Sequence, residues 1–260
     1  MTPEAFAVVV PAQDEAELVG DCLDSVVTAV RGAGVPVAVV LVAHRCSDDT
    51  EAVARRQLSR LSGRSEGRVL RLGHGTVATA RSAGNMAALH LLAAYGVPFD
   101  RTWLLSTDAD SRVPADWLRQ YGRWAATGAH AVAGHVRVSG WEDGESAVSR
   151  TAREAYNHLL RTTGPHVYAA NLGVRADAYL EAGGWPDQVP GEEHALLAAL
   201  RERGRHSVSA PEIVVGTSGR QAARAAGGLG ELLGRLASAQ STPAGTFARA
   251  VPRQALRSQP

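Results

Sequence analysis

The sequence predicts an α/β fold in which a mostly parallel central sheet is flanked by helices. Three observations support this prediction. Segments with strand and helix patterns alternate four times in the first half of the 260 residues, which is typical of parallel strands joined by helices. The strand segments are short continuous apolar runs, as expected for strands buried on both faces. Polar residues gather directly after these runs, where open parallel sheets bind their ligands.

The first half contains four expected strands and four expected helices. The strands are residues 6–10, 37–42, 69–72 and 102–106, and the helices are residues 14–31, 47–61, 79–95 and 116–127. We expect Ser47 to be the N-cap of the second helix, because a side-chain oxygen there can accept a hydrogen bond from a helix N–H group. Acidic residues follow it in the first turn, where the helix dipole favours them.

The second half is less regular. Strands are expected at residues 131–138, 169–174 and 213–215, and helices at residues 147–162 and 192–203. From about residue 243 the sequence offers few apolar anchors. We therefore expect this last segment to be a mobile or loosely docked tail.

Composition excludes several classes of protein. The 27 basic and 26 acidic side chains give a net charge of +1, so no general attraction to nucleic acid or to an anionic membrane is expected. The two cysteines, Cys22 and Cys46, form neither a disulfide framework nor a zinc pattern. The first residues do not resemble a signal peptide, and no apolar run reaches the roughly 18 residues that span a bilayer. We expect a soluble, cytoplasmic protein without a transmembrane segment.

The segment Asp108-Ala109-Asp110 follows the fourth expected strand. In a turn, this spacing can direct two carboxylates at one point, and two such oxygens suit a hard divalent cation, Mg²⁺ or Mn²⁺. Such a cation would neutralise the charge that builds on a departing diphosphate. The alternative is an ordinary solvated turn, since aspartate is common in turns. The position at the carboxyl end of a parallel strand favours the metal site.

Six segments in order along residues 6–220 share the pattern of one enzyme family. They read VVVPAQDEAELVGDCLDSV, LVAHRCSDDT, GTVATARSAGNMAA, STDADSRVPADWL, AANLGVRADAYLEAGGWP and GEEHALLAAL. With these segments, the chain resembles the family-2 glycosyltransferases of the A-type fold. None of the six is decisive alone, but their order along nearly the whole chain makes the resemblance specific.

The resemblance implies one Rossmann-like domain over residues 1–220. Residues 1–115 would form the nucleotide-sugar-binding half and residues 116–220 the acceptor-binding half, followed by a C-terminal helix and tail at residues 221–260. It also implies transfer of a hexosyl group from a nucleoside diphosphate to a hydroxyl or amine, with Mg²⁺ or Mn²⁺ as cofactor.

The resemblance also implies roles for individual residues. The metal would be held by Asp110 and Asp108, and the acceptor would lose its proton to Glu193. The nucleotide sugar would be bound by Pro11, Gln13, Asp14, Glu15, His44, Arg81, Asp108 and Ala109. The acceptor would be bound by Trp141, Asn171, Gly184, Trp185 and Glu192.

Each of these residues also has a structural alternative. Pro11 can simply end a strand, Arg81 can be a surface charge, and the two acids at Glu192 and Glu193 can favour the first turn of a helix through its dipole. Trp141, together with Tyr156 and His158, can belong to the core instead of the acceptor pocket. A catalytic base must also lie within reach of the proton that it removes.

The sequence departs from the family pattern at the base-reading end of the donor site. Ala43 and His44 stand where the family often has two acids, one of which reads uracil, and Gln13 removes an aromatic side chain from the first turn. A UDP-sugar remains the favoured donor, with a GDP-sugar as the second candidate. Glu193 replaces the family's aspartate, and in an enzyme that retains the anomeric configuration it would orient a substrate instead of deprotonating it.

Further basic residues follow the last expected strand. Arg220 and Arg224 are four residues apart, so on a helix they would share one face and could clamp a diphosphate through their planar guanidinium groups. The alternative is a solvated basic helix start. His194 and His206 are candidates for a third metal ligand, although a lone histidine is more often structural.

Two rival functions remain open at this point. One is a nucleotide-sugar-binding relative that has weak or no activity, which the residues at Ala43, His44 and Glu193 favour. The other is a sugar nucleotidyltransferase, but such enzymes carry a glycine-rich basic loop after the first strand, whereas Pro11-Ala12-Gln13-Asp14-Glu15 is acidic and has no glycine. The acceptor and the oligomeric state are not specified by the sequence.

Overall fold

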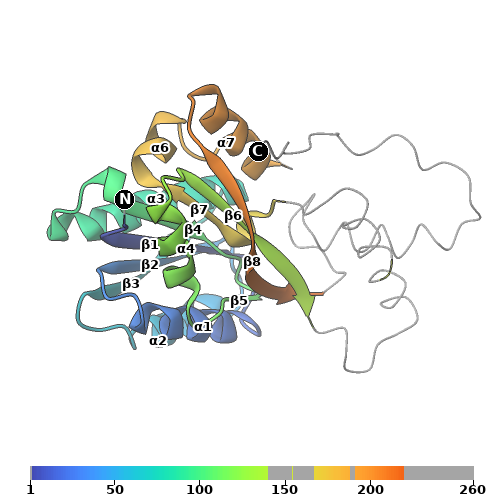
Figure 1. Ribbon diagram of the computed structural model, residues 1–260. Coiled ribbons are helices and arrows are strands. Elements are labelled where there is room, and N and C mark those ends of the chain that lie inside the picture. Colours follow the sequence, from blue (N-terminus) through green and yellow to red (C-terminus); the bar gives the residue numbers. More distant parts are fainter. Residues whose placement is uncertain (1, 140–153, 155–166, 188–190, 220–260) are drawn as a thin grey trace, which may run out of the picture. The chain divides into compact units, whose positions relative to one another are not determined.

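A computed structural model describes residues 2–139, 154, 167–187 and 191–219 (Figure 1). The chain forms two compact units, residues 1–138 with 167–218 and residues 139–166 with 219–260. Nearly all the described residues belong to the first unit. The expected helix at residues 147–162, except for residue 154, and the expected tail lie outside the described residues.

The first unit is built on one eight-stranded sheet with the order β3-β2-β1-β4-β7-β6-β8-β5 (Figure 1). Strands β1 to β4 are parallel, whereas β7 is antiparallel to β4, β6 to β7 and β5 to β8. The strands are β1 (Ala5–Ala12), β2 (Val37–His44), β3 (Ser65–Leu72), β4 (Thr102–Ser106), β5 (Ser111–Arg112), β6 (Ala131–Ser139), β7 (Leu172–Arg175) and β8 (Ser207–Ser218). The α/β fold is confirmed, with a parallel part that is extended by antiparallel strands.

Most helices lie where they were expected. They are α1 (Val19–Arg31), α2 (Thr50–Leu58), α3 (Val77–Leu92), α4 (Trp117–Ala126), α6 (Ala176–Glu181) and α7 (Glu192–Glu202), with the short 3-10 helices η1 (Ala93–Tyr95), η2 (Phe99–Arg101) and η3 (Ala169–Asn171). None of the described helices is long and apolar enough to cross a bilayer.

Two helices start three or more residues later than the sequence predicts. The first helix begins at Val19 and not at residue 14, because Asp14 has a φ of 51°, outside the helical region. The prediction that Ser47 caps the second helix was wrong, since the N-cap position is Asp49. The backbone N–H and the hydroxyl of Ser47 instead donate to Asp14 Oδ1 in the preceding loop.

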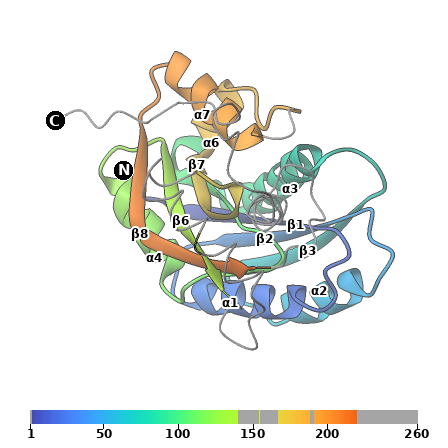
Figure 2. The ribbon, with the colours of Figure 1, turned by 90° about the vertical axis from the view of Figure 1, so that its right-hand side faces the viewer.

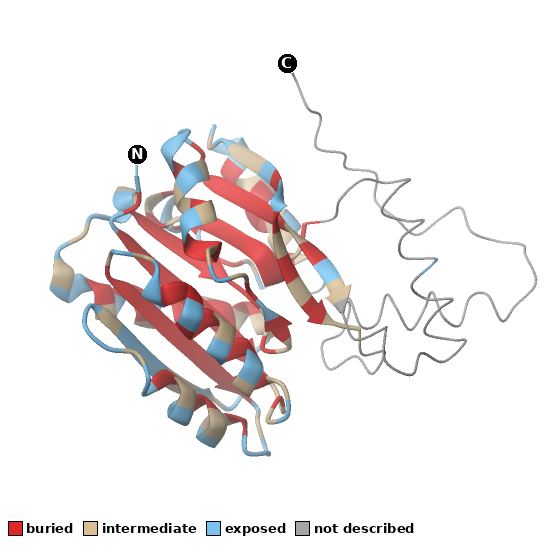
Figure 3. Ribbon diagram, turned by 60° about the horizontal axis from the view of Figure 1, so that its bottom comes forward, coloured by how far each residue is buried: buried red, intermediate tan, exposed pale blue. Residues whose placement is uncertain are grey.

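Each face of the sheet is covered by its own set of helices, and alternate residues of β1 serve the two faces. Phe6, Val8 and Val10 pack with residues of α1, α2 and α4. Ala7 and Val9 pack with residues of α3, α6 and α7. Figures 2 and 3 show this layering and the burial of the central strands, which explains their continuous apolar sequences.

Helix α3 lies unusually close to the sheet. A Cβ atom on Gly84 would be 2.4 Å from Val9 Cγ1 and 3.0 Å from Val42 Cγ2, so only glycine permits this approach. Arg81 lies three residues earlier on the same helix and therefore on nearly the same face. The close packing brings the Arg81 side chain to the carboxyl end of β4.

Asn171 joins the second half of the sheet to its helices. Its Oδ1 accepts from Trp117 Nε1 (3.0 Å) and Tyr121 Oη (2.8 Å), and its Nδ2 donates to the carbonyl groups of His135 (2.7 Å) and Ile213 (2.9 Å). These four bonds use the full capacity of a carboxamide, and the residue is fully buried. The structure thus corrects the expectation that Asn171 binds the acceptor, because no polar group of its side chain is left to do so.

We predict that Asn171→Ala lowers the free energy of unfolding by about 4 kcal/mol or more, because four buried polar groups lose their partner. Tyr121→Phe, which removes one of the four bonds, should cost only about 1 kcal/mol. Urea unfolding followed by circular dichroism measures both values. Equal effects of the two variants would show that Asn171 does not hold these groups together.

Candidate functional site

The Asp108-Ala109-Asp110 segment forms a turn at the carboxyl end of β4, as predicted. The backbone N–H of Ser111 closes the turn on the carbonyl group of Asp108 at 3.0 Å. Ala109 is buried, whereas the Asp108 side chain keeps 39% of its surface exposed. The turn therefore buries its middle residue and leaves a carboxylate accessible to a ligand.

Residues of β8, more than 100 positions further along the chain, hold Asp110 in place. The hydroxyl groups of Thr217 (3.2 Å) and Ser111 (3.3 Å) donate to its Oδ1, and the backbone N–H of Ser218 donates to its carbonyl group at 3.2 Å. Thr217 lies on β8, which pairs with Ser111 of β5. The sequence did not single out Thr217 for this contact, because β5 has only two residues and no apolar pattern.

Arg81 is the charged centre of the site. Its guanidinium donates to Asp108 Oδ1 through Nη2 (2.8 Å), to Glu192 Oε1 through Nη1 (2.6 Å) and to Ser106 Oγ through Nε (3.2 Å). Arg81 is only 4% exposed, so its charge is balanced inside the protein. The structure therefore excludes the alternative that Arg81 is a surface charge.

The indole ring of Trp185 packs against the same guanidinium. The Arg81 Cζ atom is 5.3 Å from the centre of the indole ring, a favourable cation–π distance. Gly184, with a φ of 80°, allows the turn that precedes Trp185, and the backbone N–H of Trp185 donates to Tyr179 Oη at 3.2 Å. Glu192 and Trp185, both expected at the acceptor, thus contact Arg81 from buried positions.

Glu193 stands in the first turn of α7, directly after the Arg81 partner Glu192. Its side chain is 16% exposed. Burial raises the pKa of Glu193 to about 7, and the negative charges of Glu192 and Asp108 act in the same direction. A carboxylate with this pKa can both accept and release a proton near neutral pH, as a general base requires.

The two histidines proposed as metal ligands lie in different surroundings. His194 is on α7 with a side chain that is 57% exposed, 3.9 Å from Glu193 Oε1, and partial burial lowers its pKa. His206 accepts backbone hydrogen bonds from His130 and Ala131 at the start of β6. His206 therefore lies near the amino end of β4, whereas the Asp108 turn follows the carboxyl end. The expectation that His206 is a metal ligand was wrong.

The donor set at the turn consists of two aspartates. Within the described part of the chain, Asp108 and Asp110 are not joined by a third acidic, histidine or cysteine side chain close enough to share one ion. Carboxylate oxygens suit Mg²⁺ and Mn²⁺, which commonly take their remaining ligands from water and from substrate phosphates. The turn therefore fits a divalent cation that is bound together with a diphosphate.

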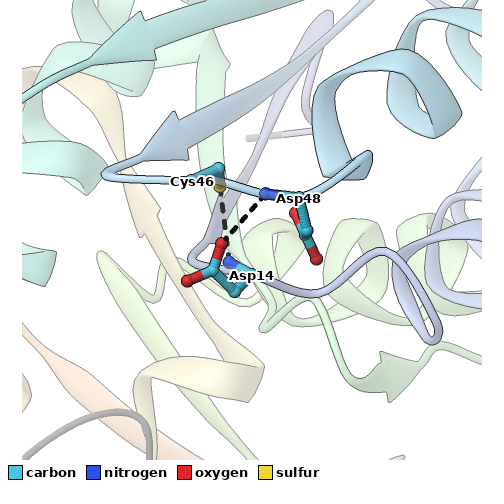
Figure 4. Close-up of side chains that lie close together, drawn as sticks. All are labelled: Asp14, Cys46 and Asp48. Carbon is cyan, nitrogen blue, oxygen red and sulfur yellow. Dashed lines mark hydrogen bonds between the residues drawn. The ribbon is translucent and has the colours of Figure 1, made fainter.

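Another acidic group links the loops after β1 and β2, and Figure 4 shows its residues. Asp14 Oδ1 accepts from the backbone N–H groups of Ser47 (2.7 Å) and Asp48 (3.3 Å), and the Asp14 N–H donates to Cys46 Sγ at 3.4 Å. Asp48 Oδ2 in turn accepts from the N–H of Ala16 at 2.9 Å. The hydrogen bond from Ser47 lowers the pKa of Asp14. These contacts identify the group as a clamp between two loops.

The side chain of His44 is also committed to the protein. It is 5% exposed, and its Nε2 donates to the carbonyl group of Gly75 at 2.8 Å in the loop before α3. Pro11 on β1 and Glu15 in the following loop are also buried, whereas Gln13 is half-buried. The Glu15 N–H donates to Thr50 Oγ1 at 2.7 Å.

Several predicted site residues lie outside the described residues, namely Trp141, Tyr156, His158, Arg220 and Arg224. Their roles remain predictions. The described chain continues to residue 219, and Ser218 already contacts Asp110.

The comparisons with known proteins agree with this geometry. A family model described as "Glycosyltransferase like family 2" matches residues 3–226, whereas no curated protein matches. A mannosyltransferase from Pyrobaculum calidifontis, in complex with GDP-Man and Mn²⁺, has a TM-score of 0.60 at 20% identity, over 83% of this chain and 57% of that one. TarS 1-349 from S. aureus, in complex with UDP-GlcNAc, has a TM-score of 0.58 at 12% identity, over 94% and 68%.

The chain spans 61% of the TarS 1-349 structure without a named ligand and 57% of the mannosyltransferase, less than two thirds of either. At such low identities, the structural likeness supports the fold alone. The family model, by contrast, covers most of the sequence and both halves of the sheet. The chain therefore belongs to the family-2-like glycosyltransferases and has their A-type fold.

Proposed function

We propose that this chain is a metal-dependent glycosyltransferase that moves a hexosyl group from a nucleoside diphosphate to an unidentified acceptor in the cytoplasm. A UDP-sugar is the favoured donor and a GDP-sugar is the second candidate. One observation carries the proposal: a mostly buried Glu193, whose pKa burial raises to about 7, follows Glu192, which Arg81 links to the Asp108 turn. A proton acceptor and a cation-binding turn are thereby tied to one guanidinium.

The donor side of the proposal rests on the Asp108-Ala109-Asp110 turn. Asp110 and Asp108 would hold Mg²⁺ or Mn²⁺, which when bound neutralises negative charge on the departing diphosphate. Arg220 and Arg224 would clamp the same diphosphate. Pro11, Gln13, Asp14, Glu15 and His44 would line the nucleoside pocket. The clamp between the loops supports this role by holding their backbone in place before the donor arrives.

The acceptor side of the proposal rests on Glu193. It would take the proton of the acceptor hydroxyl while the acceptor oxygen forms a bond to C1 of the sugar and the bond from C1 to the diphosphate oxygen breaks. The leaving nucleoside diphosphate keeps the electron pair of that bond. Trp141 and the residues around Gly184 and Trp185 would contribute to the acceptor pocket.

We predict that Asp110→Asn abolishes the stabilisation of the protein by UDP or GDP plus Mn²⁺, because a carboxamide supplies no charge to the cation. Thermal-shift titration with each nucleotide, with and without Mn²⁺, measures the effect and names the preferred base. Asp100→Asn is a matched control, since Asp100 lies in η2 at the opposite end of β4. An unchanged metal-dependent shift in Asp110→Asn contradicts the proposed site.

We predict that the rate at which the bound sugar nucleotide is cleaved to nucleoside diphosphate rises with pH and levels off above about pH 7. The reason is that Glu193 must lose its proton to act as a base. Glu193→Gln should lower the rate by about 10² to 10⁴ while nucleotide binding persists. Glu202→Gln at the other end of α7 is the control. Binding without turnover in the wild-type chain would instead identify a non-catalytic nucleotide-sugar-binding relative.

A further inference from the structure

Arg81 joins two distant parts of the chain through one guanidinium. Its acceptors are Ser106 at the end of β4, Asp108 in the following turn, and Glu192 in the first turn of α7, which is 111 residues away along the chain. The Trp185 ring covers one face of the group. Each of the three nitrogen atoms donates to the protein, so the rigid planar fork fixes the relative positions of all three acceptors.

Asp108 is held at two points, which together set the direction of its carboxylate. Cys22 Sγ donates to its backbone carbonyl at 3.3 Å, and Arg81 donates to Oδ1. Among the described residues, no donor reaches Oδ2. One oxygen of Asp108 is thus committed to Arg81, while the other remains for a ligand on a side chain that is 39% exposed.

We propose that Arg81 is a positioning residue that orients Asp108 for the metal and keeps the Asp108 turn at a fixed separation from α7 and its base Glu193. The proposal rests on the proposed function and assigns Arg81 a different role from contact with the base or ribose of the donor. A guanidinium that already serves three acceptors of the protein and an aromatic ring acts on the donor through Asp108.

The two roles of Arg81 give different dependences on the metal. A residue that orients a metal ligand affects nucleotide binding only when the metal is present, and the loss of such a partner typically costs 10- to 100-fold in metal affinity. A residue that contacts the nucleoside weakens binding to the same extent with and without metal. Lysine preserves the charge at position 81 but cannot reach three acceptors at once.

Calorimetric titration of the full chain with UDP and GDP, with and without Mn²⁺, separates these roles. We expect Arg81→Lys to weaken Mn²⁺-dependent nucleotide binding roughly 10- to 100-fold and to leave metal-free nucleotide binding unchanged. Glu192→Gln removes the second charge that balances Arg81, so it should weaken the same binding to a smaller extent. In the double variant, Glu192→Gln should cause no further loss of Mn²⁺-dependent nucleotide affinity, because Glu192 acts on Asp108 only through the guanidinium of Arg81.

Arg175→Lys is the matched control. Arg175 forms a comparable, mostly buried pair with Asp177, at 2.6 Å and 2.7 Å, but it lies beside the amino end of β4. This variant should lower stability without changing the Mn²⁺-dependent affinity. An equal loss for Arg81→Lys with and without Mn²⁺, or additive effects of the two substitutions at Arg81 and Glu192, would overturn the proposal.

A second measurement needs no metal and no nucleotide. A double-mutant cycle of the unfolding free energy of the metal-free protein should show coupling between Arg81→Lys and Glu192→Gln. Absence of coupling contradicts the link between the Asp108 turn and α7.

If the wild-type chain binds no nucleotide with Mn²⁺, the proposed function fails, while this cycle still tests the link. If Arg81→Lys does not fold, Glu192→Gln alone must weaken Mn²⁺-dependent binding, and an unchanged affinity refutes the role.

Discussion

The buried charge of Arg81 constrains the arrangement of everything around it. A cation removed from water must be paired with opposite charge and hydrogen-bonded, or the cost of burial destabilises the fold. Here the balance comes from Asp108 and Glu192, which belong to opposite halves of the chain. Because the pairing needs α3 close to the sheet, the absence of a side chain at Gly84 is a condition of the site as much as of the core.

A second fixed point holds the antiparallel half of the sheet. The carboxamide of Asn171 joins two aromatic residues of α4 to the backbone at His135 and Ile213. Gly134 leaves room for it, since a Cβ atom there would be 2.3 Å from Asn171 Nδ2. Arg81 and Asn171 together show how polar groups inside this fold specify single positions, whereas the surrounding valine and alanine side chains only require burial.

The sequence predicted the parallel strands well, and the physical reason is their environment. The prediction for β4 matches at both ends, and β1 and β2 extend only one or two residues beyond their expected limits, because strands covered on both faces are continuous apolar runs. The prediction for β3 was too short, since its first residues are polar and lie at the exposed edge of the sheet. The short elements β5 and α6 have no period to recognise.

The site was predictable only in part, for a similar reason. The Asp108 turn and the acids at the start of α7 have local sequence patterns. The pairing of Arg81 with Glu192, the bond from Thr217 to Asp110 and the saturation of Asn171 depend on contacts between distant segments. Ser47 shows the same limit on a smaller scale: its hydroxyl serves the loop after β1, not the helix that follows it.

The pairing of β5 with β8 also affects how the protein forms. Ser111 and Thr217 are 106 residues apart, and contacts of such high sequence separation form late, because chain entropy must be lost before they are made. β1, β2 and β4 can pair while the second half of the chain is still being synthesised. Asp110 gains its Thr217 contact only after β8 has left the ribosome and joined the sheet. A nascent chain can therefore pair its parallel strands before the Asp108 turn gains its contact from β8.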